Sequence, residues 1–302
     1  MLKQIGVLLF ICLKLSLYAT DEEPNYIEFG AISLSQKSNI TPMNLKENLT
    51  ISSFNESETT QNEINPYISF QYKYKYNDLL YLTTLDYDQK FSLDIYNDSY
   101  GTKIFTKPYF EYKNPYKLNS KRETTYVQDI GIGEYYTLKS NEDSKFDIAY
   151  YLSNKELSND TLAQETPSLK RDGNTHRIEF STEYEFFKIN SGLFITENMG
   201  NAENHKGIDL KLSTAYNFEN NFQVDGEIDL KHTIYDDINP IFDITNKIND
   251  TKISLYTEYD FPQSNYYLTT GVSLNKQYSN IPFFNESNKI FSFAVGKNFK
   301  TY

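Results

Sequence analysis

The chain has 302 residues, with 41 acidic and 29 basic side chains, one cysteine, no tryptophan, 27 tyrosines and 21 phenylalanines. A net charge of −12 disfavours nucleic-acid binding, which needs a basic surface. One cysteine excludes a disulfide scaffold, and an aromatic content of 16% argues against a disordered chain. The excess of tyrosine is the first feature that the fold has to explain.

The first residues have the pattern of an export signal. Lys3 precedes an apolar run from Ile5 to Leu17, and Ala19 stands before a polar segment. That order of basic, apolar and small residues is typical of a secretory signal peptide. The run is shorter than the ~20 residues that a membrane-spanning helix needs, which disfavours a membrane anchor. We predict a signal peptide over residues 1–19 and a single exported domain over residues 20–302.

Apolar and polar residues alternate along most of the remaining chain. Ile208, Leu210 and Leu212 occupy alternate positions, with Asp209 and Lys211 between them. Period-two alternation is typical of a strand with one apolar and one polar face. Fourteen segments follow this pattern or a weaker form of it. In chain order they are residues 26–36, 68–76, 79–86, 90–97, 103–113, 123–138, 146–152, 177–186, 188–197, 208–218, 222–231, 253–261, 266–274 and 288–301.

The connections between these segments alternate in length. Short turns, such as residues 219–221, alternate with longer polar loops, such as residues 37–62, 154–174 and 236–250. Only residues 86–89 break the pattern, because they are short where a long loop is due. Long loops at one end and tight turns at the other are typical of an outer-membrane barrel. In lipid every backbone amide has to be paired, so a sheet that spans a membrane has to close on itself.

We therefore predict an all-β fold, a transmembrane antiparallel up-and-down β-barrel of about 14 strands, with 12 as the alternative count and both termini in the periplasm. The aromatic surplus has a place in such a barrel, since tyrosine and phenylalanine form girdles at both membrane interfaces. A soluble β-sandwich or a lipocalin-like barrel also has alternating strands and stays open as the alternative fold. The heavily charged polar face favours the transmembrane barrel.

The end of the chain has the pattern of an insertion signal. Residues 290–302 resemble the C-terminal targeting strand of outer-membrane barrels, with Gly296 and Phe299 at its characteristic positions. Thr301 stands where the final aromatic residue belongs, and Tyr302 follows one residue late. The resemblance implies the barrel-insertion machinery as a partner.

Four internal segments carry a second resemblance. They are Ser38-Asn39, Ile51 to Asn55, Arg122 to Val127 and Asn239 to Phe242. In sequence, spacing and order they are similar to an uncharacterised family of Gram-negative envelope proteins, expected to be outer-membrane β-barrels. The resemblance implies the fold and the location, and it brings no activity with it.

Signals for catalysis and for cofactors are weak. His176, His205 and His232 share no metal-ligand spacing, and the chain has no nucleotide-binding glycine motif and no hydrolase serine motif. His232 has the parity of outward-facing apolar residues, where a membrane-embedded lipid hydrolase would hold its base. We expect no cofactor, no metal and no enzyme, with the lipid hydrolase as a remote alternative.

The polar face of the later strands carries nine acidic and four basic residues. An acid-rich, water-filled lumen favours cations, whereas cross-strand pairs of acids and bases would merely stabilise the wall. Both interpretations stay open at this point. The predicted lumen-facing charges are Arg177, Glu179, Glu183, Glu185, Asp209, Lys211, Asp225, Glu227, Asp229, Lys231, Lys252, Glu258 and Asp260.

The leading hypothesis is a porin-like passive channel in the bacterial outer membrane for small hydrophilic solutes, with cation preference. The alternative is a non-conducting structural or surface-recognition barrel with a plugged lumen. Residues 37–62 separate the two hypotheses, because this loop would form the plug if it folded inward. The expected partners are outer-membrane lipid, the insertion machinery and small solutes or cations, and nucleic acid is not among them.

Overall fold

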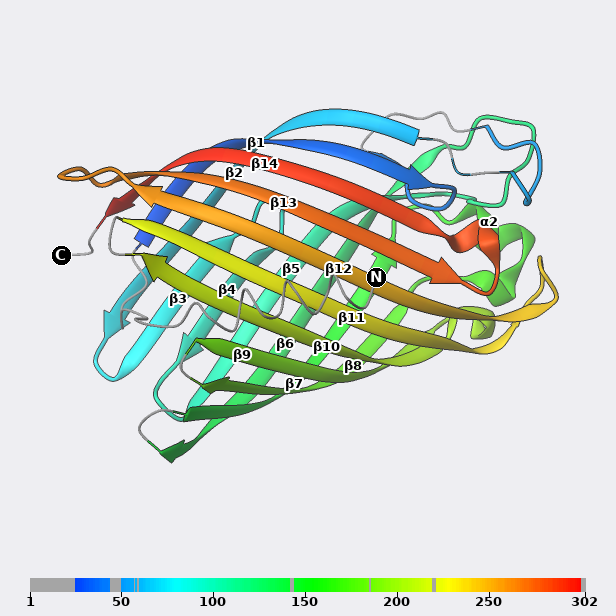
Figure 1. Cartoon of the computed structure of the whole chain (residues 1–302). Coiled ribbons are helices and arrows are strands. Elements are labelled where there is room, and N and C mark those ends of the chain that lie inside the picture. The colour runs from blue at the N-terminus through cyan, green and yellow to red at the C-terminus, as the bar shows by residue number, and fades with distance from the viewer. Residues whose placement is uncertain are drawn as a thin grey trace, which may run out of the picture.

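Strands make up most of the computed structural model, which describes residues 25–43, 50–56, 58, 60–141, 144–184, 186–218 and 221–299 (Figure 1). The predicted signal peptide, residues 1–19, lies outside the described residues. None of the described helices is long and apolar enough to cross a membrane.

The elements follow one another as an almost unbroken series of strands. The first seven are β1 (Asn25–Ser38), β2 (Thr60–Tyr76), β3 (Leu79–Leu85), β4 (Phe91–Tyr96), β5 (Tyr100–Tyr112), β6 (Thr124–Asn141) and β7 (Ser144–Leu157). The last seven are β8 (Gly173–Tyr184), β9 (Phe187–Asn198), β10 (His205–Phe218), β11 (Phe222–Asn239), β12 (Ile244–Asp260), β13 (Tyr266–Ser279) and β14 (Glu286–Phe299). The short helices are α2 (Thr161–Glu165), η1 (Pro167–Leu169), η2 (Asn201–Glu203) and η3 (Pro282–Phe284).

All the strands belong to one sheet that closes on itself. Each strand pairs antiparallel with its neighbours in sequence, and β1 pairs with β14 from Asn25 opposite Phe299 to Ser38 opposite Glu286. The predicted closed barrel of 14 antiparallel strands is confirmed, and the alternative of a two-sheet sandwich is excluded. The first strand begins and the last strand ends at the end that carries the tight turns, here called the short-turn end, and the opposite end is the loop end (Figure 1).

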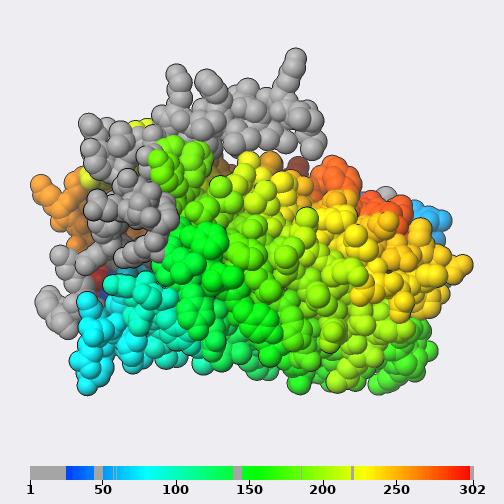
Figure 2. Space-filling model, turned by 90° about the horizontal axis from the view of Figure 1, so that it is seen from below, coloured from blue at the N-terminus to red at the C-terminus, as the bar shows by residue number. Residues whose placement is uncertain are grey.

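The two faces of the wall differ as the alternation predicts. On β10, Ile208 is 54% exposed on the outer face, whereas Asp209 and Lys211 lie on the inner face. The exposed apolar side chains of the other strands share the outer parity, and Figure 2 shows part of this outer face over the green and yellow strands. Aromatic rings on the outer face contact one another near the short-turn end. The pairs are Tyr72–Phe299, Tyr100–Tyr136, Phe146–Phe180 and Tyr216–Phe218.

A second group of aromatic residues faces inward and covers glycines of neighbouring strands, which the girdle prediction did not include. The Tyr151 ring covers Gly133, its register partner on β6, so closely that a Cβ atom there would overlap the ring. The rings of Phe105 and Tyr267 cover Gly131 and Gly296 in the same way. These inward rings lie flat against the wall, so they do not project into the middle of the barrel.

Several strands extend further than predicted at the loop end. β11 continues to Asn239 and β12 begins at Ile244, so the predicted loop over residues 236–250 is wrong and only residues 240–243 connect the strands. β2 likewise begins at Thr60 instead of residue 68. Such strand ends carry polar residues on both faces, since Asp236, Asp237 and Asn239 follow one another closely. Alternation marks a strand only where its two faces meet different environments.

The inward rings give a test of the wall packing. We expect Gly133→Ala to destabilise the barrel by about 1–3 kcal/mol, the usual cost of overpacking, because its methyl group overlaps the Tyr151 ring. The same change should cost less in a Tyr151→Ala background. Urea unfolding in detergent measures both differences, and an equal cost in the two backgrounds would show that the ring does not rest on this glycine.

Candidate functional site

The predicted charges lie on the inner parity of their strands. Of the thirteen, Glu185 lies outside the described residues, and the other twelve alternate with outward residues of β8, β10, β11 and β12. Their surroundings differ, so they form more than one kind of site. Six of them form ion pairs on the wall, whereas Asp225, Glu258 and Asp260 form none with the described residues.

Two charge ladders lie on the inner face of the wall, and the first reaches across β9 from β8 to β10. Arg177 on β8 donates to Glu179 at 2.9 Å and to Asp209 on β10 at 2.8 Å. Glu227 on β11 accepts from Lys211 at 2.6 Å and from Lys252 at 3.2 Å. Opposite charges along one strand and across the wall neutralise each other, so these six residues stabilise the wall.

The acidic residues nearest the short-turn end have a different environment. Asp225 accepts two hydrogen bonds from the Gln223 amide, at 2.9 and 3.0 Å. The charged groups acting on Glu258 are Asp260, Asp225 and Glu28, all of them acidic. Glu28 itself accepts from the hydroxyls of Tyr67 at 2.8 Å and Thr269 at 3.1 Å. The donors to Asp225 and Glu28 are neutral, so they leave the charge of these two carboxylates uncancelled.

The remaining predicted charges have separate positions. Lys231 Nζ lies 4.7 Å from the centre of the Phe194 ring, an inward cation–π contact. Asp229 faces the ladder acids Asp209 and Glu227 as well as their lysines. Glu183 is exposed, one residue before the end of β8.

The turn between β3 and β4, residues 86–90, folds toward the lumen. Its Tyr87 ring packs edge-on against inward Tyr67 at 6.2 Å, and its Asp88 pairs with inward Lys107 at 2.6 Å. The Tyr87 hydroxyl faces that of Tyr256 on β12. Because β12 lies five strands away around the barrel, this turn narrows the lumen. The irregular length of residues 86–89 was the only sequence signal for it.

The long loops fold together at the loop end into a cap. The cap comprises residues 39–43, 50–56, 113–123, 158–172, 199–204, 240–243 and 280–285. Its core is a cluster of aromatic rings in mutual contact, with Phe54 5.1 Å from Phe242 and Tyr116 5.7 Å from Phe283. These residues come from four different loops, so the core holds the loops to one another as a unit.

The described part of residues 37–62 belongs to this cap. Ile51 is 2% exposed and bridges to Leu118, and Asn119 N–H donates to the Ile51 carbonyl at 2.8 Å. Phe54 enters the aromatic core. These described residues therefore lie over the mouth of the barrel at the loop end, where Figure 1 shows the blue loop beyond the strands.

A buried arginine joins two of the cap loops. Arg122 is fully buried, and its guanidinium lies 4.1 Å from the centre of the Tyr112 ring. It donates to the carbonyl of Asn39 and, at 3.0 Å, to that of Pro115. Asn239 donates to the Tyr116 hydroxyl at 3.3 Å. The four segments that carry the family resemblance thus converge on the cap.

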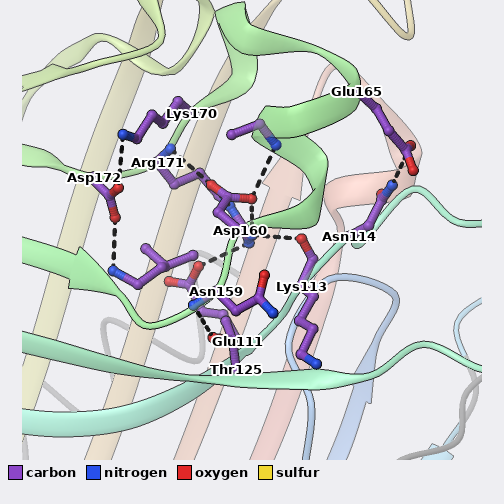
Figure 3. Close-up of polar contacts among 12 residues, drawn as sticks. Glu111, Lys113, Asn114, Thr125, Asn159, Asp160, Glu165, Lys170, Arg171 and Asp172 are labelled. Carbon is purple, nitrogen blue, oxygen red and sulfur yellow. Dashed lines mark hydrogen bonds and ion pairs between the residues drawn. The ribbon is translucent and has the colours of Figure 1, made fainter.

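A second arginine ties the cap to the wall (Figure 3). Arg171 donates to Glu111 on β5 at 3.1 Å, to Asp160 at 2.9 Å and to the Lys113 carbonyl at 3.1 Å. Burial opposes its charge, but the carboxylates of Glu111 and Asp160 outweigh that effect and raise the pKa of Arg171. Sequence reasoning missed this site, because its members are distant in sequence and follow no periodic pattern.

The histidines do not gather into a catalytic or metal site. His232 Nδ1 lies 2.8 Å from Asn249 Oδ1 on the outer face, an amide partner instead of a hydrolase serine. His176 contacts the Tyr150 hydroxyl at 2.7 Å, and His205 contacts the Glu203 carbonyl at 2.9 Å. Within the described part of the chain, no three His, Cys, Asp or Glu residues are arranged to hold a metal ion.

An apolar outer face, a charged lumen and loops gathered at one end define a β-barrel of the transmembrane type. The chain belongs to the family described as protein of unknown function (DUF2860), whose sequence profile matches residues 25–298. The family resemblance expected from the cap motifs is thereby confirmed.

Solved structures with a similar architecture are bacterial outer-membrane barrels. A Pseudomonas aeruginosa FadL homologue has a TM-score of 0.49 at 8% identity, over 92% of this chain and 91% of that one. The CymD monoaromatic hydrocarbon channel has a TM-score of 0.47 at 7% identity, over 93% and 90%. An anion-selective porin from Comamonas acidovorans has a TM-score of 0.38 at 8% identity, over 92% and 100%. No protein with a curated description matches the sequence.

Removal of the Arg122 side chain should open the cap. We expect Arg122→Ala to destabilise the cap by about 2–4 kcal/mol, because two carbonyl groups lose a charged donor and Tyr112 loses its stacking partner. Hydrogen exchange of residues 113–123 measures the effect. Lys117→Ala, an exposed change in the same loop, is the control. Equal exchange in the two variants would contradict the role of Arg122.

The cap should also become less stable as pH rises. Burial raises the pKa of Glu203 from 4.5 to about 7, despite the nearby charges of Arg171 and Lys155, while Glu111 and Asp160 add to the increase. The folded cap therefore binds this proton more tightly than the unfolded chain, and the stability falls as pH rises from about 4.5 to about 7.

We expect a loss of about 1–3 kcal/mol across that window, and Glu203→Gln should remove it. Unfolding of the cap at pH 5 and pH 8, followed by limited proteolysis, measures the difference. A pH dependence that is identical in the Gln variant would assign the effect to other groups.

Proposed function

We propose that this protein is an outer-membrane channel through which small hydrophilic solutes pass passively, with cations favoured. The observation that carries the proposal is the acidic group of Asp225, Glu258 and Asp260 on the inner face. Most basic residues of the predicted set are neutralised in the ladders, so the acids determine the local potential. A negative potential at a water-filled mouth raises the local concentration of cations.

The location follows from the outer face of the wall. Side chains such as Phe29, 60% exposed, and Phe291, 52% exposed, are favoured by contact with lipid instead of water. The segment over residues 1–19 supports export, and the last strand, which pairs with the first, supports assembly by the insertion machinery. In this orientation the short-turn end faces the periplasm and the cap faces the outside.

The inward turn and the cap determine what can pass. Tyr87 narrows the lumen from one wall, so we propose that the channel admits small solutes and rejects large ones. The cap supports a second candidate function, a surface-recognition barrel whose conduction is blocked at the loop end. Its closely packed aromatic core favours that candidate, because such a core does not open readily.

Ion currents separate the two candidates. Purified protein in planar bilayers should conduct, and its reversal potential in a KCl gradient should show cation preference. The triple change Asp225→Asn, Glu258→Gln and Asp260→Asn should lower the cation-to-anion permeability ratio several-fold. Glu156→Gln, an exposed outward change on β7, is the matched control and should leave the ratio unchanged.

Two results would contradict the proposal. Bilayers that stay silent at all voltages would favour the recognition barrel. An unchanged permeability ratio in the triple variant would show that these acids do not select the permeating ion.

A further inference from the structure

Two neighbouring strands of the barrel, β3 and β4, are much shorter than the others. β3 has 7 residues and β4 has 6, whereas the other twelve strands have 12 to 18. Seven residues at ~3.3 Å each cover about 23 Å, and a tilt of about 40° reduces their height to about 18 Å. The apolar band of a membrane barrel is ~25 Å tall, so this hairpin is too short to span it.

A gap in backbone pairing lies above the hairpin. β2 pairs with β3 only from Phe70 to Tyr76, so its residues 60–69 have no strand on that side. β5 pairs with β4 only from Gly101 to Thr106, which leaves its residues 107–112 in the same condition. The two unpaired edges face each other across the gap, and none of the described pairings joins them.

Proline marks both edges of the gap. Among the described strands, proline occurs only at Pro66 on β2 and Pro108 on β5, and each lies within an unpaired segment. Proline lacks an amide hydrogen, so it cannot complete a ladder and is suited to edge strands. The two prolines oppose any extension of the hairpin that would close the gap, so the gap is encoded in the sequence.

The outer rim of the gap is apolar. On β2, Ile64 is 74% exposed and Ile68 is 41% exposed, both on the lipid-facing parity, and Phe110 has that parity on β5. A sheet edge exposed to hydrocarbon is costly unless it lines a cavity that holds water or another molecule. An unpaired edge with an apolar rim therefore fits a passage from the lumen into the surrounding lipid.

The inner side of the gap is aromatic with a few polar atoms. Tyr67 and Tyr109 lie on the inner parity of the two edges, and Tyr87 packs against Tyr67 from below. Nearer the loop end, Gln61 of β2 and Tyr112 of β5 interact with each other, and Arg122 stacks on the Tyr112 ring. The rings of Tyr67, Tyr87 and Tyr109 below them suit contact with a small aromatic molecule.

We infer that the gap between β2 and β5 is a lateral portal, through which a small apolar or amphipathic aromatic molecule moves between the lumen and the lipid leaflet at the loop end. The portal is a route separate from ion conduction through the lumen. The turn that carries Tyr87 lies at the inner opening of the portal, because it contacts β2 through Tyr67 and β5 through Lys107.

Uptake of a fluorescent apolar probe tests the portal. The protein is inserted in vesicles with a lipopolysaccharide outer leaflet, and entry of N-phenyl-1-naphthylamine is followed by its fluorescence. We expect faster entry than in protein-free vesicles. The paired change Ile64→Asn and Ile68→Asn should lower the protein-dependent rate several-fold, since polar amides at the rim oppose passage of an apolar molecule. Val272→Asn with Leu274→Asn, on the fully paired wall of β13, is the control.

A shift in gel mobility on boiling in SDS shows that each variant is folded whether or not it conducts, which keeps this test apart from the channel hypothesis. If the rim variant does not fold, Tyr87→Ala tests the portal instead. Loss of the Tyr87 ring should widen the inner opening of the portal and raise the rate of probe entry. The portal is refuted if rim and control pairs give the same rate, if Tyr87→Ala leaves the rate unchanged, or if the protein does not accelerate entry.

Discussion

The structure depends on one constraint, the pairing of every backbone amide in a wall that has lipid on its outer side. The antiparallel seam between β1 and β14 satisfies it by removing the free edges of the sheet. Closure then determines which residue types each face carries, because successive side chains of a strand point alternately to the lipid and to the lumen. Among the described strands, the longest unpaired segments flank the short strands β3 and β4, and a proline lies in each of these segments.

The interior follows from the same closure. A barrel of 14 strands lies between the small barrels that side chains fill and the porins of about 16–18 strands with an aqueous channel, and its inner face carries charged groups. The charges differ by position: those around Arg177 and Glu227 form ladders on the wall, whereas the charged groups acting on Glu258 are all acidic. Inward rings rest on glycines such as Gly133, and the loops above form a cap with its own aromatic core.

The strand number and the antiparallel order were predictable, because the alternation of apolar and polar residues is a local pattern that a membrane-spanning strand keeps over its whole length. The ends of β11 and β12 were not, since strands that emerge into water lose the contrast between faces. The Arg171 site and the position of Tyr87 depend on contacts between residues far apart in the chain, which no local pattern shows. The motif around Arg122 was visible in the sequence, but its role in joining two loops required the fold.

The central claim is that a closed sheet separates lipid from a hydrated lumen. Single cysteines placed at successive positions from Ile208 to Ser213 on β10, in protein reconstituted into lipid vesicles, test it most directly. A water-soluble thiol reagent should label the positions of Asp209, Lys211 and Ser213, while those of Ile208, Leu210 and Leu212 should be quenched by a lipid-borne quencher. Labelling without this alternation, or recovery of the protein in the aqueous phase without detergent, would contradict it.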